Sequence, residues 1–335
     1  MSVINAENGL LAPLKGEEIK LRLMELKAPA DAVMGQLLSS HVPLIEEVSR
    51  YILFSDGKRL RPVLFLLCAR ILGWPAPAEL SVIFEYLHAA SLLHDDVIDN
   101  AGLRRGQVAA QIKYGNPEVI LVGDFLFAKS YFLSATHPDP AFSSALAQCS
   151  AAMAEGQILE LMHTGNLELD EAAYEQIIIG KTAILIATAC KMAAIYAKAP
   201  PAVIEALYQY GVHLGIAFQM VDDALDYSAS EKEVGKEVDH DLQEGKITLP
   251  FIWTRDNSQQ RDKLMELARR AHNNPANSHQ AGEIVRAHGG VTATMEQALG
   301  QAQTAQNILK TLDLPPGQDL DLLYSLASYV VTRRN

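Results

Sequence analysis

Cysteine is scarce in this chain of 335 residues, and its three cysteines belong to no recognisable metal or redox motif. Cys68, Cys149 and Cys190 lie far apart in apolar stretches, without a Cys-x-x-Cys spacing or a neighbouring pair of histidines. This pattern is typical of buried thiols in a reducing compartment and argues against a disulfide framework. We therefore expect a cytoplasmic protein.

Positive charge is also in short supply. The chain has 28 Lys and Arg against 40 Asp and Glu, which gives a net charge of −12. Nucleic acids require dense Lys/Arg surfaces, so we expect no nucleic acid partner. Any basic site in this protein must be local.

Signals for a membrane anchor are missing too. Residues 1–15 have no basic start followed by an apolar core, and we expect no later segment to have the apolar length of a membrane span. We expect a soluble protein whose membrane contact, if any, is peripheral. With 49% hydrophobic residues and no linker, the chain is predicted to form one domain over residues 1–335, with 1–20 as a variable N-terminal segment.

Strand signals are almost absent, whereas apolar residues recur at steps of three and four along most of the chain, which predicts helices. The predicted helices cover residues 31–54, 59–72, 76–99, 117–135, 141–163, 171–197, 202–227, 247–272 and 282–312. Clusters of Pro and Gly separate several of them, so the connections are short. We predict an all-α fold, a large antiparallel helical bundle.

The most informative feature that the chain does have is an acidic pentad that occurs twice. The copies are Asp95-Asp96-Val97-Ile98-Asp99 and Asp222-Asp223-Ala224-Leu225-Asp226. At about 100° per helical residue, the three acids of each copy share one helix face. Crowded carboxylates repel one another, and hard divalent cations with open positions for phosphate oxygens relieve that repulsion. A lone pentad is usually a solvated helix face, but two copies after apolar runs predict one metal–diphosphate site between two helices.

Basic residues follow each pentad at short range, as a polyanionic substrate would require. Arg104 and Arg105 follow the first, and Lys236 and Lys246 follow the second. Segment 57–62, Gly-Lys-Arg-Leu-Arg-Pro, adds three cations where a helix is predicted to begin, which is a suitable place for an anion. Two anionic groups could therefore be held at once.

The order and spacing of these motifs are similar to those of the trans-isoprenyl diphosphate synthases. The matched stretches are 57–62, 88–105, 123–124, 180–182, 218–226, 244–246 and 248–250. The sequence most resembles the long-chain, octaprenyl-forming members. This resemblance implies the type I isoprenoid synthase fold, a helical bundle with a central cavity. It also implies a homodimer and possible peripheral membrane contact for product release.

The resemblance implies which residues meet the allylic diphosphate. The implied ligands of three magnesium ions are Asp95, Asp99 and Asp222, and the acids that support them are Asp96, Asp223 and Asp226. The basic residues implied to contact the same diphosphate are Arg104, Lys181, Lys236 and Lys246. Farnesyl diphosphate is the expected starter.

A second substrate, isopentenyl diphosphate, is implied opposite, with its phosphates held by Lys58, Arg61, His88 and Arg105. Helical spacing independently places His88 near the first pentad, because it lies two turns before Asp95 on nearly the same azimuth. Departure of the allylic diphosphate would leave a carbocation, which the double bond of isopentenyl diphosphate attacks head to tail, giving an all-trans product. The carbonyl of Lys181, the hydroxyl of Thr182 and the amide of Gln219 would shield that cation.

Product length should depend on the residues just before the first pentad. Ala90 and Ser91 are small where short-chain relatives tend to have a bulky aromatic residue, which implies a deep tunnel and a long product for a quinone side chain. The tunnel floor could come from the next aromatic-rich segment, which contains Phe125, Phe127, Tyr131 and Phe132. By default these aromatics are plain core.

Other functions remain open from the sequence. A short-chain geranylgeranyl or farnesyl diphosphate synthase would share every motif except the small residues. A terpene cyclase of the same fold needs no second diphosphate site, so Lys58, Arg61 and Arg105 count against it. A non-catalytic partner subunit typically lacks one acidic cluster, whereas both are complete here. One departure from the family pattern lies near the site: Glu160 stands where long-chain relatives often have glutamine.

Overall fold

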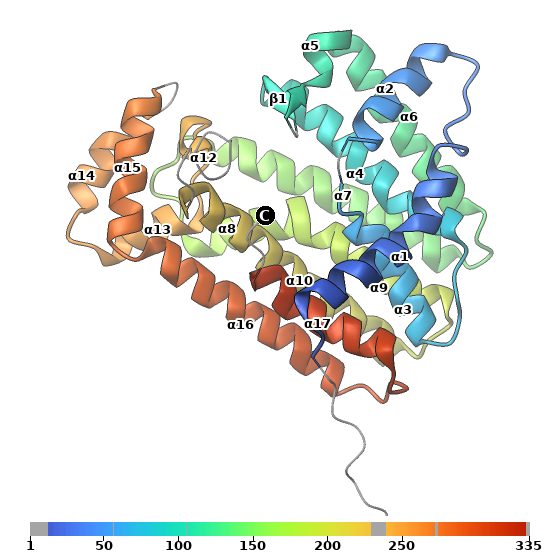
Figure 1. The fold of residues 1–335 in the computed structure, drawn as a ribbon. Helices are drawn as coiled ribbons and strands as arrows, with labels where there is room; N and C mark the ends of the chain where they lie inside the picture. Colours follow the sequence, from blue (N-terminus) through green and yellow to red (C-terminus); the bar gives the residue numbers. More distant parts are fainter. Residues whose placement is uncertain (1–12, 56, 105, 229–238, 272–273, 333–335) are drawn as a thin grey trace, which may run out of the picture. The chain divides into compact units, whose positions relative to one another are not determined.

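The computed structural model describes residues 13–55, 57–104, 106–228, 239–271 and 274–332 (Figure 1). The structure is 77% helical with almost no strand, which confirms the all-α prediction. The helices are α1 Gly16–Met34, α2 Pro43–Leu53, α3 Leu60–Ile71, α4 Ala78–Ile98, α5 Ala110–Tyr114, α6 Asn116–Ala135, α7 Pro140–His163, α8 Glu171–Ile178, the π-helical turn η1 Ile179–Ala183, α9 Ile184–Tyr196, α10 Pro201–Ser228, α12 His240–Gln243, α13 Leu249–Asn257, α14 Arg261–Ala268, α15 Pro275–Ala287, α16 Gly290–Lys310 and α17 Gln318–Thr332. Strands β1 Leu103–Arg104 and β2 Gln107–Val108 form one short antiparallel ladder.

Three of the predicted helices were too long. The run 31–54 is divided between α1 and α2, with Pro43 at the start of α2, where its missing N–H costs no helical hydrogen bond. The run 247–272 breaks at Ser258, whose backbone is extended (φ −109°, ψ 156°). The run 282–312 breaks before α16 at Gly289, whose φ of 89° favours glycine. Helix α1 begins at Gly16, so much of it was missed.

The chain divides into two compact units. The first comprises Met1–Gln148, Thr188–Tyr208 and Thr311–Leu326, and the second comprises Cys149–Ala187, Gln209–Lys310 and Ala327–Asn335. Helices α7, α10 and α17 contribute residues to both units, as does α9. That the whole chain folds as one domain stays a prediction.

The first unit is organised around α4. This helix is buried along most of its length, packs along α6, and also contacts α1, α2 and α3. Aromatic side chains fill the space between them: the rings of Phe65 on α3 and Phe84 on α4 lie 5.3 Å apart, and both are fully buried. The Tyr86 hydroxyl donates a 2.6 Å hydrogen bond to the carbonyl of Met34, which ties α4 to the end of α1. The first pentad therefore lies at the end of a helix that is held by contacts with several neighbouring helices.

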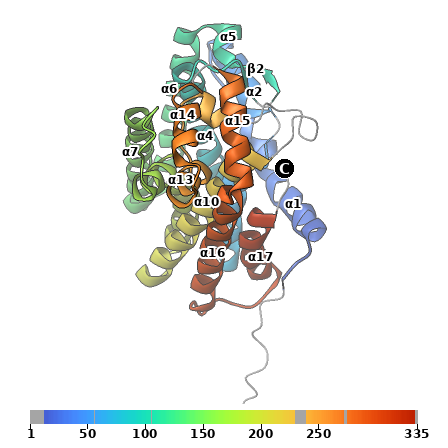
Figure 2. The same ribbon diagram turned by 90° about the vertical axis from the view of Figure 1, so that its left-hand side faces the viewer.

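The second unit depends on close helix approach. A Cβ added to Gly211 of α10 would lie 2.5 Å from the Cα of Ala187, so only glycine allows these backbones to touch. Helix α13 packs on α16, and α14 lies beside α15 in both views (Figure 1, Figure 2). The close approach fixes α10, which carries the second pentad near its end.

One stretch, Glu171–Tyr196, has the length and apolar composition that could cross a membrane, contrary to the sequence-based expectation. In the structure 72% of its most apolar window is buried. A core helix of a globular protein gives the same signal, so this finding is weak evidence for a span.

Candidate active site

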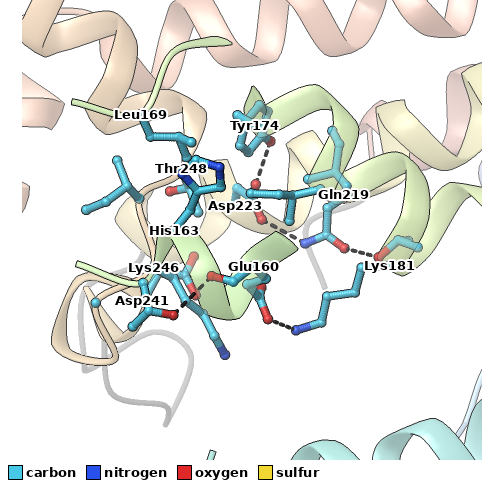
Figure 3. Close-up of a pocket in the computed structure, with 16 residues that line it drawn as sticks. Glu160, His163, Leu169, Tyr174, Lys181, Gln219, Asp223, Asp241, Lys246 and Thr248 are labelled. Atoms are coloured by element: carbon cyan, nitrogen blue, oxygen red, sulfur yellow. Dashed lines mark hydrogen bonds and ion pairs between the residues drawn. The ribbon is translucent and has the colours of Figure 1, made fainter. Parts of the chain in front are cut away.

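A cavity of about 140 Å³ opens in the second unit (Figure 3). Its walls come from α7, α8, η1 and α10 and from the segment between Asp241 and Thr248. Five residues that the sequence analysis assigned to the site line it: Lys181, Thr182, Gln219, Asp223 and Lys246. They come from three separate parts of the sequence, so the fold gathers them in one place.

A chain of hydrogen bonds fixes Asp223 at the wall of this cavity. The Tyr174 hydroxyl donates to Oδ2 of Asp223 over 2.5 Å, and Nε2 of Gln219 donates to Oδ1 over 2.7 Å (Figure 3). The Thr182 hydroxyl in turn donates to Oε1 of Gln219 over 2.7 Å. Both oxygens of Asp223 are thus held, and the orientation of Gln219 is fixed by Thr182.

Burial raises the pKa of Asp223 to about 7. The hydrogen bonds from Tyr174 and Gln219 lower the pKa, whereas the neighbouring charges of Asp222 and Asp226 raise it. Asp223 is only 5% exposed, so water does little to stabilise its charge. A cation nearby would favour the ionised form.

The other acids of the second pentad differ from Asp223. Asp222 is exposed, and Asp226 accepts 3.2 Å hydrogen bonds from the backbone N–H groups of His240 and Asp241. Asp226 therefore holds the start of α12. Burial raises the pKa of Asp241 well above its usual value, and the charges of Asp226 and Asp223 add to that effect. Asp241 thus belongs to the same acidic cluster.

Both lysines of the cavity are paired with glutamates. The Lys181 ammonium contacts the carboxylate of Glu160, and the Lys246 ammonium lies 2.6 Å from that of Glu244. Lys181 lies on η1, a single π-helical turn of a kind that is frequent at functional sites. The lysines are thus held in place by protein anions.

The first pentad lies at the end of α4 in the first unit. Asp95 and Asp99 are half-buried, whereas Asp96 is fully buried. Arg104 donates from Nε to Oδ1 of Asp96 over 2.7 Å, and its Nη2 contacts the same oxygen. Burial raises the pKa of Asp96, and the Arg104 charge opposes that rise. The structure therefore places Arg104, expected to contact diphosphate, against an acid of the pentad.

The three cations of segment 57–62 differ in exposure and in partners. Lys58 is exposed and Arg61 half-buried at the first turn of α3, whereas Arg59 points inward. The Arg59 guanidinium contacts Glu85 at 2.6 Å, Asp31 at 2.9 Å and the carbonyl of Leu53. Its φ of 52° is unusual for a residue other than glycine. Arg59 was counted as a cation for an anion, and that interpretation was wrong because its charge is already neutralised inside the unit.

The residues proposed to set product length lie on α4 and α6. Ala90 is fully buried, and the half-buried Ser91 donates a 2.8 Å hydrogen bond to the carbonyl of His88, which is also half-buried. On α6, Phe125 is half-buried, whereas Phe132 is 66% exposed in this unit. The tunnel-floor assignment stays a prediction.

Two predicted site residues, Arg105 and Lys236, lie outside the described residues. Sequence reasoning did not assign Tyr174 or Asp241 to the site. Tyr174 lies seven residues before Lys181, a spacing that places both on one helical face and could have suggested it. Asp241 lies between the second pentad and Lys246, and its acidity was the available signal.

The donor set can be tested against a divalent cation. No group of three or more His, Cys, Asp or Glu side chains poised to hold a metal occurs among the described residues. Magnesium does not require one, because it usually takes one or two carboxylates together with phosphate oxygens and water. The buried Oδ2 of Asp96 has no hydrogen-bond partner in the part of the chain that the structure describes. The acidic residues of each pentad, taken by itself, therefore fit a hard cation whose remaining positions are filled by phosphate oxygens and water.

Comparison with known proteins decides the family. The model of the polyprenyl synthetase family matches residues 42–285. This chain belongs to the polyprenyl synthetase family. The octaprenyl diphosphate synthase of Haemophilus influenzae is 37% identical over 88% of this chain and 90% of its own. That of Escherichia coli is 36% identical over 67% of this chain and 70% of its own.

Solved structures agree with the family assignment. The polyprenyl synthase of Caulobacter crescentus, complexed with calcium and isoprenyl diphosphate, has a TM-score of 0.88 at 34% identity, covering 97% of this chain and 99% of that one. The decaprenyl diphosphate synthase of Rhodobacter capsulatus has a TM-score of 0.86 at 35% identity, covering 95% and 98%. The predicted family, the isoprenoid synthase fold and the prenyltransferase class are therefore confirmed. The enzyme elongates allylic diphosphates with isopentenyl diphosphate.

Proposed function

We propose that this chain is a magnesium-dependent, long-chain synthase whose all-trans product is octaprenyl diphosphate, used for a quinone side chain. The observation that carries the proposed length is the pair of small residues Ala90 and Ser91 on α4, one to two turns before Asp95. Relatives named octaprenyl diphosphate synthase support the same length.

The acids of the two pentads and the basic residues assigned to the site would together bind the allylic diphosphate and its metal ions. Asp95, Asp99 and Asp222 are the proposed ligands of magnesium, which when bound supplies positive charge to the departing diphosphate. Asp96, Asp223 and Asp226 would hold these acids in place. Lys181 and Lys246 would bind the diphosphate by exchanging their protein carboxylates for phosphate oxygens. Arg104 and Lys236 would contact the same diphosphate.

Isopentenyl diphosphate would be bound by Lys58, Arg61, His88 and Arg105. Thr182 and Gln219 would face the carbocation with dipoles that carry no nucleophilic charge, and their mutual hydrogen bond keeps both orientations fixed. Ionisation and positioning then account for the reaction, with no side-chain nucleophile. The proton lost at the end would go to the departed diphosphate.

Product analysis tests this proposal. Purified protein is incubated with magnesium, farnesyl diphosphate and labelled isopentenyl diphosphate, and the hydrolysed products are sized by chromatography. A single all-trans octaprenyl product is expected. A product that stops at geranylgeranyl would keep the chemistry and overturn the assigned length, and no incorporation would favour a cyclase or a partner subunit.

Substitution of Ala90 tests what limits the product. Ala90→Phe is expected to shorten the product by several isoprene units with turnover largely retained, because the ring would fill space that the growing chain needs. Ala128→Phe is a matched control, because Ala128 is exposed on α6. An unchanged octaprenyl product from a folded Ala90→Phe protein would refute the tunnel assignment.

We also propose that the enzyme is a cytoplasmic homodimer that touches the membrane only peripherally when it releases product. Light scattering of the purified protein would give twice the mass of 36.6 kDa. Flotation with phospholipid vesicles should recover more protein when long-chain product is present. A monomer, or tight vesicle binding without product, would contradict these assignments.

A further inference from the structure

Lys181, the lysine that is proposed to bind the allylic diphosphate, already forms an ion pair with a carboxylate of the protein itself. The Lys181 ammonium contacts the carboxylate of Glu160, and Figure 3 shows this pair among the residues that line the cavity. The two side chains are 25% and 17% exposed, so water screens the pair only partly. A diphosphate that binds here must displace Glu160 or share Lys181 with it.

The backbone brings this pair together. Gly156 of α7 and Gly180 of η1 touch so closely that a Cβ on Gly156 would lie 2.6 Å from the backbone carbon of Gly180. Glu160 follows Gly156 by one helical turn, and Lys181 directly follows Gly180. Both side chains are therefore attached close to the point where the two backbones touch. Nε2 of Gln157 also lies 3.3 Å from Oε2 of Glu160 and donates to it. The carboxylate is therefore positioned, rather than meeting Lys181 by chance.

The charge of the cavity makes Glu160 significant. Its walls carry three acids, Glu160, Asp223 and Asp241, against two lysines, Lys181 and Lys246. Lys246 is itself paired with Glu244. Each lysine thus has a glutamate counter-ion, and the cavity has no surplus of positive charge for a polyanion. Glu160 therefore weakens diphosphate binding through its hold on Lys181.

We propose that Glu160 is a resident counter-ion that sets how tightly the cavity binds and how fast it releases diphosphate. The ion pair between Glu160 and Lys181 breaks when an allylic diphosphate binds to Lys181, and it forms again when inorganic diphosphate dissociates. This role rests on the proposed function for the lysine, and it makes Glu160 a positioning residue. An enzyme that elongates its product repeatedly must release inorganic diphosphate from this cavity after each condensation, and the return of Glu160 to Lys181 would assist that release.

The test is Glu160→Gln, which removes the charge and keeps the size of the side chain. Inorganic diphosphate, measured by calorimetry without prenyl substrate and both with and without magnesium, should bind about five- to tenfold more tightly than to wild type. Steady-state assays should show a lower KM for farnesyl diphosphate, a lower kcat and stronger inhibition by inorganic diphosphate. KM for isopentenyl diphosphate should stay the same.

Three further variants separate this role from a structural one. Glu155→Gln changes an exposed glutamate on the same helix and should bind diphosphate as wild type does. Glu160→Asp keeps the charge and should stay within about twofold of wild type. In a Lys181→Met background, Glu160→Gln should improve binding less than twofold, because Glu160 acts through Lys181.

Unchanged diphosphate binding in Glu160→Gln, or an equal gain in the Lys181→Met background, would overturn the proposal. Melting temperatures of all variants show whether each is folded. The calorimetry needs no turnover, so it separates this proposal from the proposed function. Tighter binding in Glu160→Gln with no prenyl product from wild type would leave the counter-ion role standing and refute the synthase.

Discussion

The two acidic pentads share a pattern but are held in different ways. In each copy the second aspartate is buried, whereas the first is more open: Asp96 and Asp223 are 0% and 5% exposed, Asp95 is half-buried and Asp222 exposed. Asp96 is held by the charge of Arg104, and Asp223 by the neutral donors Tyr174 and Gln219. The second acid of each pentad therefore acts as an anchor, and the first acid is the more exposed of the two.

The anchors also differ in what they do to nearby charge. Arg104 pairs its positive charge with the Asp96 carboxylate. Tyr174 and Gln219 add no charge, and Asp241 adds another acid. The buried acid of the first pentad is therefore held by a cation, whereas that of the second is held by neutral hydrogen-bond donors.

The largest effect is expected at the open acids. Asp95→Ala and Asp222→Ala should each lower kcat on the order of 10³-fold, because each removes a ligand whose cation stabilises the departing diphosphate. Neither should lower the free energy of unfolding by more than about 0.5 kcal/mol, since neither side chain is fully buried. Single-turnover assays and urea unfolding measure both quantities. Undiminished turnover in Asp95→Ala would refute its assignment as a ligand.

An anchor should affect both stability and activity. Tyr174→Phe removes the hydroxyl that donates to Asp223. Above about pH 7, where this carboxylate is charged, the change should lower the free energy of unfolding by about 2 kcal/mol, because the hydrogen bond is buried. We expect kcat to fall about tenfold, because Asp223 loses one of its two fixed partners. Tyr208→Phe, a tyrosine of the first unit, is the control. A kcat equal to wild type would show that Tyr174 is only core.

The smallest effect is a difference in how stability depends on pH. Because the pKa of Asp223 is about 7 in the folded protein and 3.8 ordinarily, the folded state holds a proton between these values that the unfolded chain has lost. The stabilisation that protonated Asp223 gives the folded state is therefore present at low pH and is lost as the pH rises through about 7. Metal-free wild type should lose more stability than Asp223→Asn between about pH 5 and pH 7.5.

Asp96→Asn should change that pH dependence in the same direction by a smaller amount, because Arg104 opposes the rise in the Asp96 pKa. Urea unfolding at the two pH values measures both differences. An equal pH dependence in wild type and Asp223→Asn would contradict the raised pKa of Asp223.

The sequence predicted the parts that depend on local pattern. Proline and glycine punctuation placed α3, α4 and α6 within a few residues, and the pentads identified both acidic clusters. The breaks at Ser258 and Gly289 were missed because apolar periodicity continued across them. The π-helical turn at Lys181 was missed because hydrogen-bond register is not visible in composition.

Partners distant in sequence could not be predicted. Arg59 was counted with its neighbours as one of three cations in a segment suited to an anion. Glu85 and Asp31, from α4 and α1, neutralise it. Tyr174 lies 49 residues from Asp223, so only the packing of α8 against α10 shows their contact. Local spacing identifies candidate ligands, whereas the fold decides which of them point inward.

The measurement that tests the account most directly is a double-mutant cycle on kcat with Asp95→Ala, Asp222→Ala and the double variant, using labelled isopentenyl diphosphate at saturating magnesium. If both pentads serve the cations of one diphosphate, the double variant should be about as slow as the slower single variant, because residues that act as a unit have non-additive effects. Losses that multiply in the double variant would mean that the pentads act independently, and would contradict one shared diphosphate.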